Sequence, residues 1–432
     1  MLNTGLNTSP SADVVLTVDK PDCLMDEEVT VKVTGLSPND KVIILATTEL
    51  KENLFWSHGL FRANSSGDVD LRKDAPISGS YSDADPAGLL WSMVAAPWLP
   101  AYTRMFQATA IKPRTINFSV FPESNDPSEY LRDKTKVLAT AENRRWYTNT
   151  STRRIPIDHP KLKGTLFLPE GHGPFPGVID MYGAFVLIVE ERAALLSSRG
   201  FATLSLSLPQ TLPEIDLDYF EEAAEWFASL PEVRSDGIGI MSLCLGGSLA
   251  FWMAQHIPNV RAIVGINGIP CAFPYWTHKG VNIASNTRIE LARVQFNQEG
   301  FLLRDLFVVP DDSYLKPWTH GAHLLTILGL DDLLNSLEHT FHLYDDLMPQ
   351  DYRKEKAELV TYPGAGHIID PPYTPVCRIL NGFDRFLQTI PVTTPVCKRN
   401  NLIINGGYPK EHAAAQKDAW QRSVNFLKKH LC

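Results

Sequence analysis

The sequence predicts two domains: an all-β domain, an antiparallel sandwich of the immunoglobulin-like kind, in residues 1–150, and an α/β domain in residues 151–432. Up to about residue 122, short segments of alternating apolar and polar residues are separated by turns, a pattern typical of antiparallel sheets. Beyond residue 154, near-continuous apolar segments alternate with amphipathic ones. That second pattern indicates a parallel sheet covered by helices on both faces.

In the first domain, each expected strand alternates in polarity and is followed by turn residues. The expected strands cover residues 29–33, 42–49, 54–63 and 116–121. Residues 122–152 show no strong β pattern, and we expect this segment to carry the chain into the second domain.

In the second domain, short apolar runs predict strands, and longer amphipathic runs with start or stop signals predict helices. One helix ends at Gly200, and another begins with an acidic first turn at Asp216. The expected strands are residues 164–169, 177–182, 202–208, 237–243, 261–268, 324–330 and 358–364, and the expected helices are residues 189–200, 216–230, a helix from 245, and 411–430.

Composition excludes several classes of function. The chain has 40 Lys and Arg against 49 Asp and Glu, a net charge of −9, with no long basic run, so neither a nucleic-acid groove nor an anionic membrane surface is expected. No apolar stretch approaches the ~18 residues of a membrane span. We expect a small-molecule or protein partner, and a monomer or weak oligomer.

The six cysteines have no CxxC spacing, which argues against a disulfide framework or a zinc site. We expect no resident metal and no cofactor. The first fifteen residues lack the features of an export or transit signal, so we expect a cytoplasmic protein with reduced thiols. The cysteines are Cys23, Cys244, Cys271, Cys377, Cys397 and Cys432.

The sharpest local motif is the run from Gly237 to Ser248, in which a buried strand leads into Ser242-Leu-Cys244-Leu-Gly246-Gly247. This is a nucleophile elbow with Cys at its centre, and the turn requires small residues two positions before and after the nucleophile. The helix that follows would point its positive N-terminus at the thiol and favour the thiolate. Cys244 alone could equally be a small buried hydrophobe, so the motif needs partners.

Partners follow in the order that an α/β-hydrolase requires, with acid and then His each on a loop after a strand. His367 follows an apolar strand in a Gly-rich turn, and Asp331 and Asp332 follow residues 324–330. The remaining candidates are His339, His342, His412 and His430, which are expected to be solvated helix residues. We predict a catalytic triad of Cys244, Asp332 and His367, with Asp331 still open as the acid.

An oxyanion hole needs two backbone N–H groups. One is expected from Leu245, directly after the nucleophile, and the other from residues 181–183, where Tyr182 is our choice. Gly183 would let the backbone turn there, although a glycine required only for a tight turn explains this residue equally well.

At these residues the chain resembles the acyl-CoA thioesterase and bile acid-CoA:amino acid N-acyltransferase family over nearly its whole length. The matching segments include VTGLSPND, FRANSSGDVDL, GLLWSM, DMYG, RGFATLSL, DLDYFEEAAEWF, SLCLGG, YPGAGHIIDPPYTPVC and HAAAQKDAW. The resemblance implies a β-sandwich followed by an α/β-hydrolase domain, and the roles of nucleophile for Cys244, acid for Asp332 and base for His367.

The resemblance also bears on the reaction. Thioesterase members of this family generally have Ser where this chain has Cys244, whereas the N-acyltransferases have Cys. A thioester acyl-enzyme favours attack by an amine, so the expected activity is transfer of a long-chain or bile-acid-like acyl group from acyl-CoA to glycine, taurine or water. The alternatives are an acyl-CoA thioesterase, a dienelactone-type hydrolase and a non-catalytic acyl-binding protein. The chain ends His-Leu-Cys rather than in an SKL-like peroxisomal signal, which favours the cytoplasm over the peroxisome.

Overall fold

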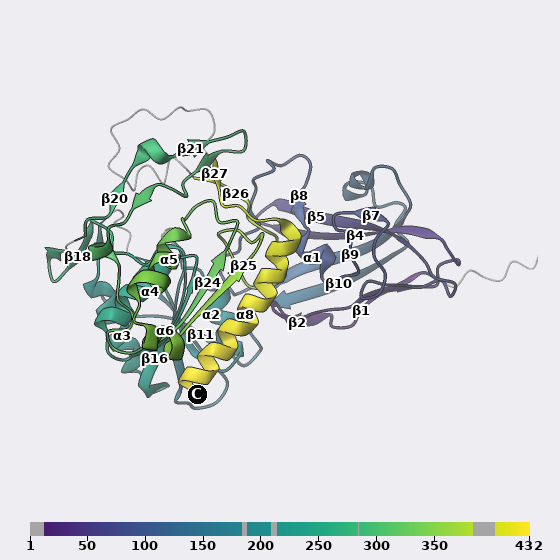
Figure 1. Cartoon of the computed structure of the whole chain (residues 1–432). Coiled ribbons are helices and arrows are strands. Elements are labelled where there is room, and N and C mark those ends of the chain that lie inside the picture. The colour runs from purple at the N-terminus through teal and green to yellow at the C-terminus, as the bar shows by residue number, and fades with distance from the viewer. Residues whose placement is uncertain (1–12, 184–187, 209–213, 284, 383–401) are drawn as a thin grey trace, which may run out of the picture. The chain divides into compact units, whose positions relative to one another are not determined.

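The computed structural model describes residues 13–183, 188–208, 214–283, 285–382 and 402–432 (Figure 1). The chain divides into two compact units. The first contains residues 1–105, 113–146 and 373–375, and the second contains residues 106–112, 147–372 and 376–432. The expected boundary at residue 150 therefore lies close to the main division at residue 146.

The N-terminal unit is built from two antiparallel-rich sheets, one with the order β1-β3-β6 and one with the order β2-β10-β9-β4-β5-β7, where β8 also pairs with β5. In β5 the residues alternate between buried and more exposed positions, as the sequence pattern predicts. The immunoglobulin-like arrangement stays a prediction. The elements are β1 (Val15–Val18), β2 (Asp22–Leu24), β3 (Val31–Thr34), β4 (Lys41–Leu50), β5 (Asn53–Arg62), β6 (Val69–Asp70), β7 (Ser78–Gly79), α1 (Gly88–Trp91), β8 (Val94–Ala95), β9 (Arg114–Pro122), the 3-10 helix η1 (Pro127–Leu131) and β10 (Ala139–Trp146).

Strand β10 lies within residues 122–152, the segment that shows no strong β pattern and that we expected to carry the chain into the second domain. It pairs with β9 along its length and with β2. Its buried face contains Asn143 and Arg145, both fully buried. Arg145 donates to the carbonyls of Met25 and Glu27, and Asn143 donates to that of Lys20. Because this inner face is polar, the strand has no hydrophobic alternation to reveal it.

The C-terminal unit is organised around an eight-stranded sheet with the order β11-β12-β14-β13-β16-β17-β24-β25. The strands from β14 to β25 are parallel, as predicted, but β11 and β12 are antiparallel to their neighbours. These strands are β11 (Arg153–Pro156), β12 (Gly164–Leu168), β13 (Phe175–Met181), β14 (Ala202–Leu206), β16 (Val233–Leu243), β17 (Val260–Ile266), β24 (His323–Gly329) and β25 (Ala357–Tyr362).

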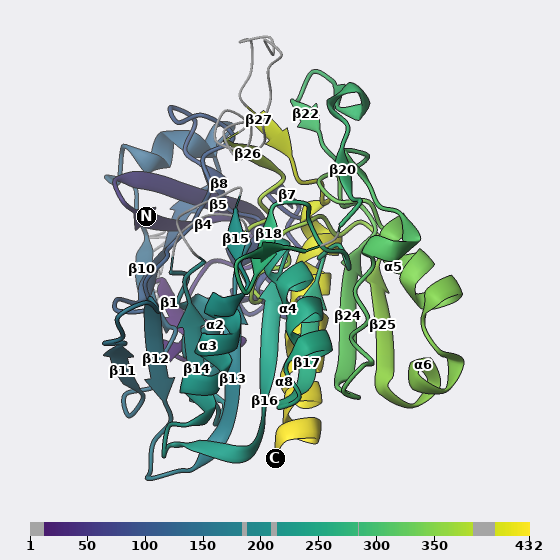
Figure 2. The same ribbon diagram turned by 90° about the vertical axis from the view of Figure 1, so that its left-hand side faces the viewer.

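Helices cover both faces of this sheet. Figure 2 shows α3 (Asp218–Ala228) and α4 (Leu245–His256) in front of the strands and α8 (Pro409–Leu431) behind them. The four predicted helices are present, and the first of them is α2 (Glu191–Ser198). Asp216, expected to begin a helix, is instead the second residue of the short strand β15 (Ile215–Asp216), and the helix begins at Asp218.

A long excursion between β17 and β24 contains short hairpin strands that no sequence pattern predicts. Two further short strands precede α8. The remaining elements are β18 (Trp276–His278), β19 (Val281–Asn282), β20 (Arg288–Ile289), η2 (Leu291–Arg293), β21 (Gln295–Phe296), β22 (Phe301–Leu302), β23 (Phe307–Val308), η3 (Asp311–Ser313), α5 (Glu338–His342), the π-helical turn η4 (Leu343–Leu347), α6 (Gln350–Lys356), β26 (Ile379–Asn381) and β27 (Leu402–Ile404). Within the described residues no helix is both long and apolar enough to cross a bilayer.

Candidate active site

Cys244 occupies the turn between β16 and α4 in a conformation that is unusual for any residue but glycine. Its φ is 59° and its ψ is −124°, in a region that L-residues rarely adopt and that is commonest where function requires it. The Cys244 N–H donates to the Ile266 carbonyl at 2.9 Å, and its carbonyl accepts from the Gly247 N–H at 2.8 Å. The sharp turn predicted for the elbow is therefore present.

The glycines after Cys244 are required by close backbone contacts. A Cβ on Gly246 would lie 2.7 Å from the Met181 oxygen, and a Cβ on Gly247 would lie 2.8 Å from the Cα of Gly268. On the other side of the turn, Ser242 is fully buried and donates to the Val264 carbonyl at 2.9 Å. The requirement for small residues on both sides of the nucleophile is met as the sequence predicts.

His367 lies on the loop after β25 and is almost completely buried, at 2% exposure. Its Nδ1 is 2.8 Å from Asp332 Oδ2. Burial by itself lowers the pKa of this imidazole, but the charges of Asp332 and Cys244 outweigh burial and raise the pKa to about 10. Nε2 is buried and makes no hydrogen bond of ordinary geometry within the described residues, and the Cys244 thiol is close enough to the ring to raise its pKa.

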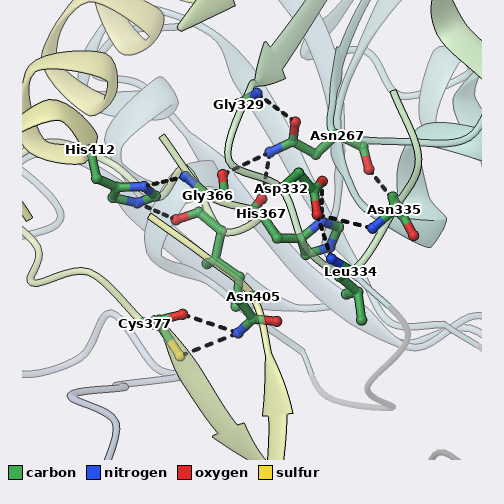
Figure 3. A network of polar contacts seen from close by, with 11 residues as sticks. Asn267, Gly329, Asp332, Leu334, Asn335, Gly366, His367, Cys377, Asn405 and His412 are labelled. Carbon is green, nitrogen blue, oxygen red and sulfur yellow. Dashed lines mark hydrogen bonds and ion pairs between the residues drawn. The ribbon is translucent and has the colours of Figure 1, made fainter. Parts of the chain in front are cut away.

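The two adjacent aspartates that the sequence left open have different surroundings. Asp332 is fully buried, and its Oδ1 accepts the N–H groups of Leu334 and Asn335 at 2.8 and 2.9 Å, which leaves Oδ2 for His367 (Figure 3). Asp331 Oδ2 instead accepts the Gly407 N–H at 2.7 Å and lies 3.6 Å from Arg378. Asp332 is therefore the carboxylate against His367, as chosen from the sequence.

The two residues expected to supply the oxyanion hole lie at the predicted places in the chain. Leu245 is the first residue of α4, so its N–H is among those that a helix leaves without an internal partner. Tyr182 directly follows β13, and its hydroxyl donates to Asp370 Oδ1 at 2.5 Å. A Cβ on Gly183 would lie 3.1 Å from Cys244 Cβ, so this glycine lets the loop approach the nucleophile. The orientation of the two N–H groups toward a substrate stays a prediction.

Comparison with known proteins identifies the family. The model described as "BAAT / Acyl-CoA thioester hydrolase C terminal" matches residues 215–432, and that described as "Acyl-CoA thioester hydrolase/BAAT N-terminal region" matches residues 26–159. The bile acid-CoA:amino acid N-acyltransferase of Mus musculus is 35% identical over 94% of this chain and 96% of that protein. The chain belongs to the acyl-CoA thioester hydrolase/BAAT family.

Similar proteins are named either N-acyltransferases, like the one above, or thioesterases. Acyl-coenzyme A thioesterase 3 of Mus musculus is 33% identical over 99% of this chain and 96% of that protein. Among solved structures, a dienelactone hydrolase-like promiscuous phosphotriesterase from metagenomic libraries is 18% identical with a TM-score of 0.38, over 65% of this chain and 98% of that one.

In this family member, Asn405, Asn267 and His412 make hydrogen bonds to the loop that carries His367. The sequence analysis assigned none of them a role in the site. The His367 N–H donates to the Asn405 carbonyl at 2.9 Å, and Asn267 Nδ2 donates to the His367 carbonyl at 2.7 Å. His412, on the first turn of α8, accepts the Gly366 N–H through Nδ1 at 3.1 Å and donates through Nε2 to the Ile368 carbonyl at 2.7 Å (Figure 3).

His412 thus corrects the expectation that the four helix histidines are solvated, because its exposure is only 1%. Burial lowers the pKa of His412 and so favours the neutral ring. A neutral imidazole has one N–H and one lone pair, which are what these two hydrogen bonds require. The only sequence signal for His412 was its place among apolar positions of the last helix. The other three, His339, His342 and His430, are partly exposed.

The described cysteines Cys23, Cys244, Cys271, Cys377 and Cys432 are free thiols, and Cys397 lies outside the described residues. Among the described residues, the group with separations that could hold a metal ion is Asp218, Glu221 and His278. His278 Nε2 lies 3.0 Å from Glu221 and 3.6 Å from Asp218, so the three side chains already satisfy one another. None of them belongs to the group around Cys244.

Proposed function

We propose that the protein is an acyl-CoA-processing enzyme that takes an acyl group onto Cys244 and passes it to an amino acid such as glycine or taurine, or to water. The observation that carries this proposal is the His367 imidazole, which is buried against Asp332 and whose pKa the charges of Asp332 and Cys244 raise to about 10 against the effect of burial. A carboxylate that fixes a His tautomer beside a nucleophile on a strained turn is the arrangement for covalent acyl transfer.

In the first half-reaction, the Cys244 thiolate attacks the carbonyl carbon of the acyl-CoA thioester. The bond from that carbon to the CoA sulfur breaks, and the leaving sulfur takes the proton from His367 Nε2. Asp332 holds Nδ1–H at 2.8 Å, which directs Nε2 toward the reaction. The Leu245 and Tyr182 N–H groups are proposed to bind the oxyanion that forms meanwhile.

In the second half-reaction, an amine or a water molecule attacks the Cys244 thioester and gives a proton to His367 Nε2. The carbon–Sγ bond breaks, and the thiolate–imidazolium pair is restored. A thioester discriminates in favour of an amine more than an oxygen ester does, so Cys244 supports amide formation ahead of hydrolysis.

Hydrolysis is the second candidate, because one of the similar proteins is named a thioesterase. The same nucleophile and base would serve with water as the acceptor. A dienelactone-type hydrolase would account for the C-terminal unit but not for the N-terminal one. A non-catalytic acyl-binding protein would have no use for a His buried against a carboxylate, since burying the two charged groups is costly.

The proposal is tested by incubating the protein with a panel of acyl-CoAs, with and without glycine and taurine, and identifying products by mass. We expect an acyl adduct on Cys244, and acyl-glycine or acyl-taurine as the larger product when the amine is present. Free acid alone, in the same yield with or without amine, would favour the thioesterase.

Cys244→Ala should abolish the adduct. Cys271→Ala is the matched control, because Cys271 is fully buried and burial raises the pKa of its thiol to about 12, which makes it a poor nucleophile. An adduct that persists in Cys244→Ala would refute the proposed function.

A further inference from the structure

Asn267 is a buried residue directly after β17, the strand that pairs with β16, which leads to Cys244. It is 1% exposed, and its φ is 49°. Asn tolerates this left-handed conformation better than most residues other than glycine. A fully buried amide in a strained turn is kept only where its hydrogen bonds are made.

Every polar atom of the Asn267 side chain is engaged (Figure 3). Oδ1 accepts the Gly329 N–H at 2.8 Å, at the end of β24. Nδ2 donates to the Gly366 carbonyl at 3.2 Å and to the His367 carbonyl at 2.7 Å. Since carbonyls can only accept and an N–H can only donate, these partners fix which end of the amide is which.

The main-chain carbonyls of residues 266 and 267 connect this turn to the other two members of the proposed triad. Its carbonyl accepts from Asn335 Nδ2 at 2.8 Å, and the Asn335 N–H donates to Asp332 Oδ1 at 2.9 Å. The preceding carbonyl, that of Ile266, accepts the Cys244 N–H at 2.9 Å. One turn of the chain therefore contacts the nucleophile directly, the base through its main chain, and the acid through one intermediate residue.

We propose that Asn267 is the positioning residue of this active site, which sets the His367 imidazole at the place where it meets both Cys244 and Asp332. This inference rests on the proposed function. Asn267 touches none of the reacting atoms, so it acts through the His367 main chain.

Asparagine suits this position for two reasons. Aspartate has the same shape and could still accept the Gly329 N–H, but it would set a negative oxygen against two carbonyls and lose both donors. Glycine would adopt the positive φ freely and lose all three side-chain bonds. The two variants Asn267→Asp and Asn267→Gly thus separate the donor function from the backbone conformation.

The test measures two quantities: the rate of Cys244 acylation by one acyl-CoA, and the rate of Cys244 alkylation by iodoacetamide as a function of pH. We expect both variants to slow acylation by about 10²-fold with little change in KM, as displacement of a catalytic group by about 1 Å does. We also expect iodoacetamide to alkylate Cys244 more slowly near neutral pH, so that the pH profile changes, because a displaced imidazolium stabilises the thiolate less.

The matched control is Asn143→Ala, which removes a buried amide from the N-terminal unit, where Asn143 donates to the Lys20 carbonyl at 2.7 Å. This change should lower the thermal midpoint and leave the acylation rate and the pH profile unchanged. A merely structural role for Asn267 would give that same result.

The outcomes separate the two proposals. If Cys244→Ala abolishes the adduct while Asn267→Gly keeps the wild-type acylation rate and pH profile, the role of Asn267 is refuted and the proposed function stands. If Cys244→Ala still forms the adduct, the proposed function itself fails. If neither Asn267 variant folds, the residue belongs to the fold and the positioning proposal is overturned.

Discussion

Exchange of Asp332 for asparagine tests the acid most directly. In Asp332→Asn, one side-chain oxygen can still accept the Leu334 and Asn335 N–H groups, at 2.8 and 2.9 Å in the wild type. The amide –NH₂ would then face His367 Nδ1, 2.8 Å away. Nδ1 must become an acceptor there, so the ring proton moves to Nε2 and the neutral ring can no longer accept a proton on that side.

The size of the effect follows from the pKa of His367. The difference between about 10 and the ordinary 6.5 corresponds to about 5 kcal/mol in favour of the imidazolium. Asp332 and Cys244 together contribute more than this net effect, because burial opposes them. Half of the net effect, about 2 to 3 kcal/mol or about 30- to 150-fold in rate, is therefore a lower bound for the loss of the Asp332 charge. The unsuitable tautomer adds to this loss, and we expect a fall in kcat/KM of at least about 100-fold.

The assay is steady-state turnover of one acyl-CoA, with Asp331→Asn as the control. Asp331 accepts the Gly407 N–H and lies 3.6 Å from Arg378, and an amide oxygen preserves the first contact. We expect this control to keep turnover within about threefold, since a partly exposed ion pair at 3.6 Å contributes little. A large loss in Asp331→Asn with near-normal turnover in Asp332→Asn would refute our assignment of the acid.

Three further predictions concern the same unit. Cys244→Ser should shift products from amide toward free acid; an unchanged ratio, measured by mass, would remove the argument from the thiol. Gly247→Ala should lower the free energy of unfolding by about 1–3 kcal/mol in urea titration, because its Cβ would overlap a facing backbone, whereas Gly265→Ala, with 3.6 Å of clearance, should be milder. Because the pKa of His367 is raised to about 10 in the folded state, protonation of this ring contributes its full stabilisation below pH 6.5, and the contribution is lost as pH rises through about 10. The difference in unfolding free energy between wild type and Asp332→Asn should therefore shrink over that range. A difference independent of pH would contradict this prediction.

The α/β unit could be predicted well because its chemistry is local. The apolar strands and amphipathic helices read directly as a covered parallel sheet, and the small residues around Cys244 follow from the steric demands of one turn. The order of Cys244, Asp332 and His367 along the chain then led to the prediction of the triad. These are properties of short segments, and they can be recognised directly in the sequence.

The features that we did not predict depend on contacts between segments that are far apart in the sequence. Strand β10 was missed because its buried face contains Asn143 and Arg145, whose burial depends on carbonyls more than a hundred residues away. Asn267 and His412 were missed because their partners come from other loops, and an Asn or His with distant partners looks like any polar residue. Strand β12 was predicted, but its antiparallel direction was not, because pairing direction is not encoded in hydrophobicity.

The attachment of the His367 loop to α8 has a consequence for when activity can begin during synthesis. Cys244, Asp332 and His367 are all made before His412, whose ring bonds the residues on either side of the base. Domains generally form as units while the chain lengthens. On the proposed function, a ribosome-bound chain that already contains these three residues but not yet α8 would therefore lack the His412 contacts to the His367 loop and would have little activity toward acyl-CoA.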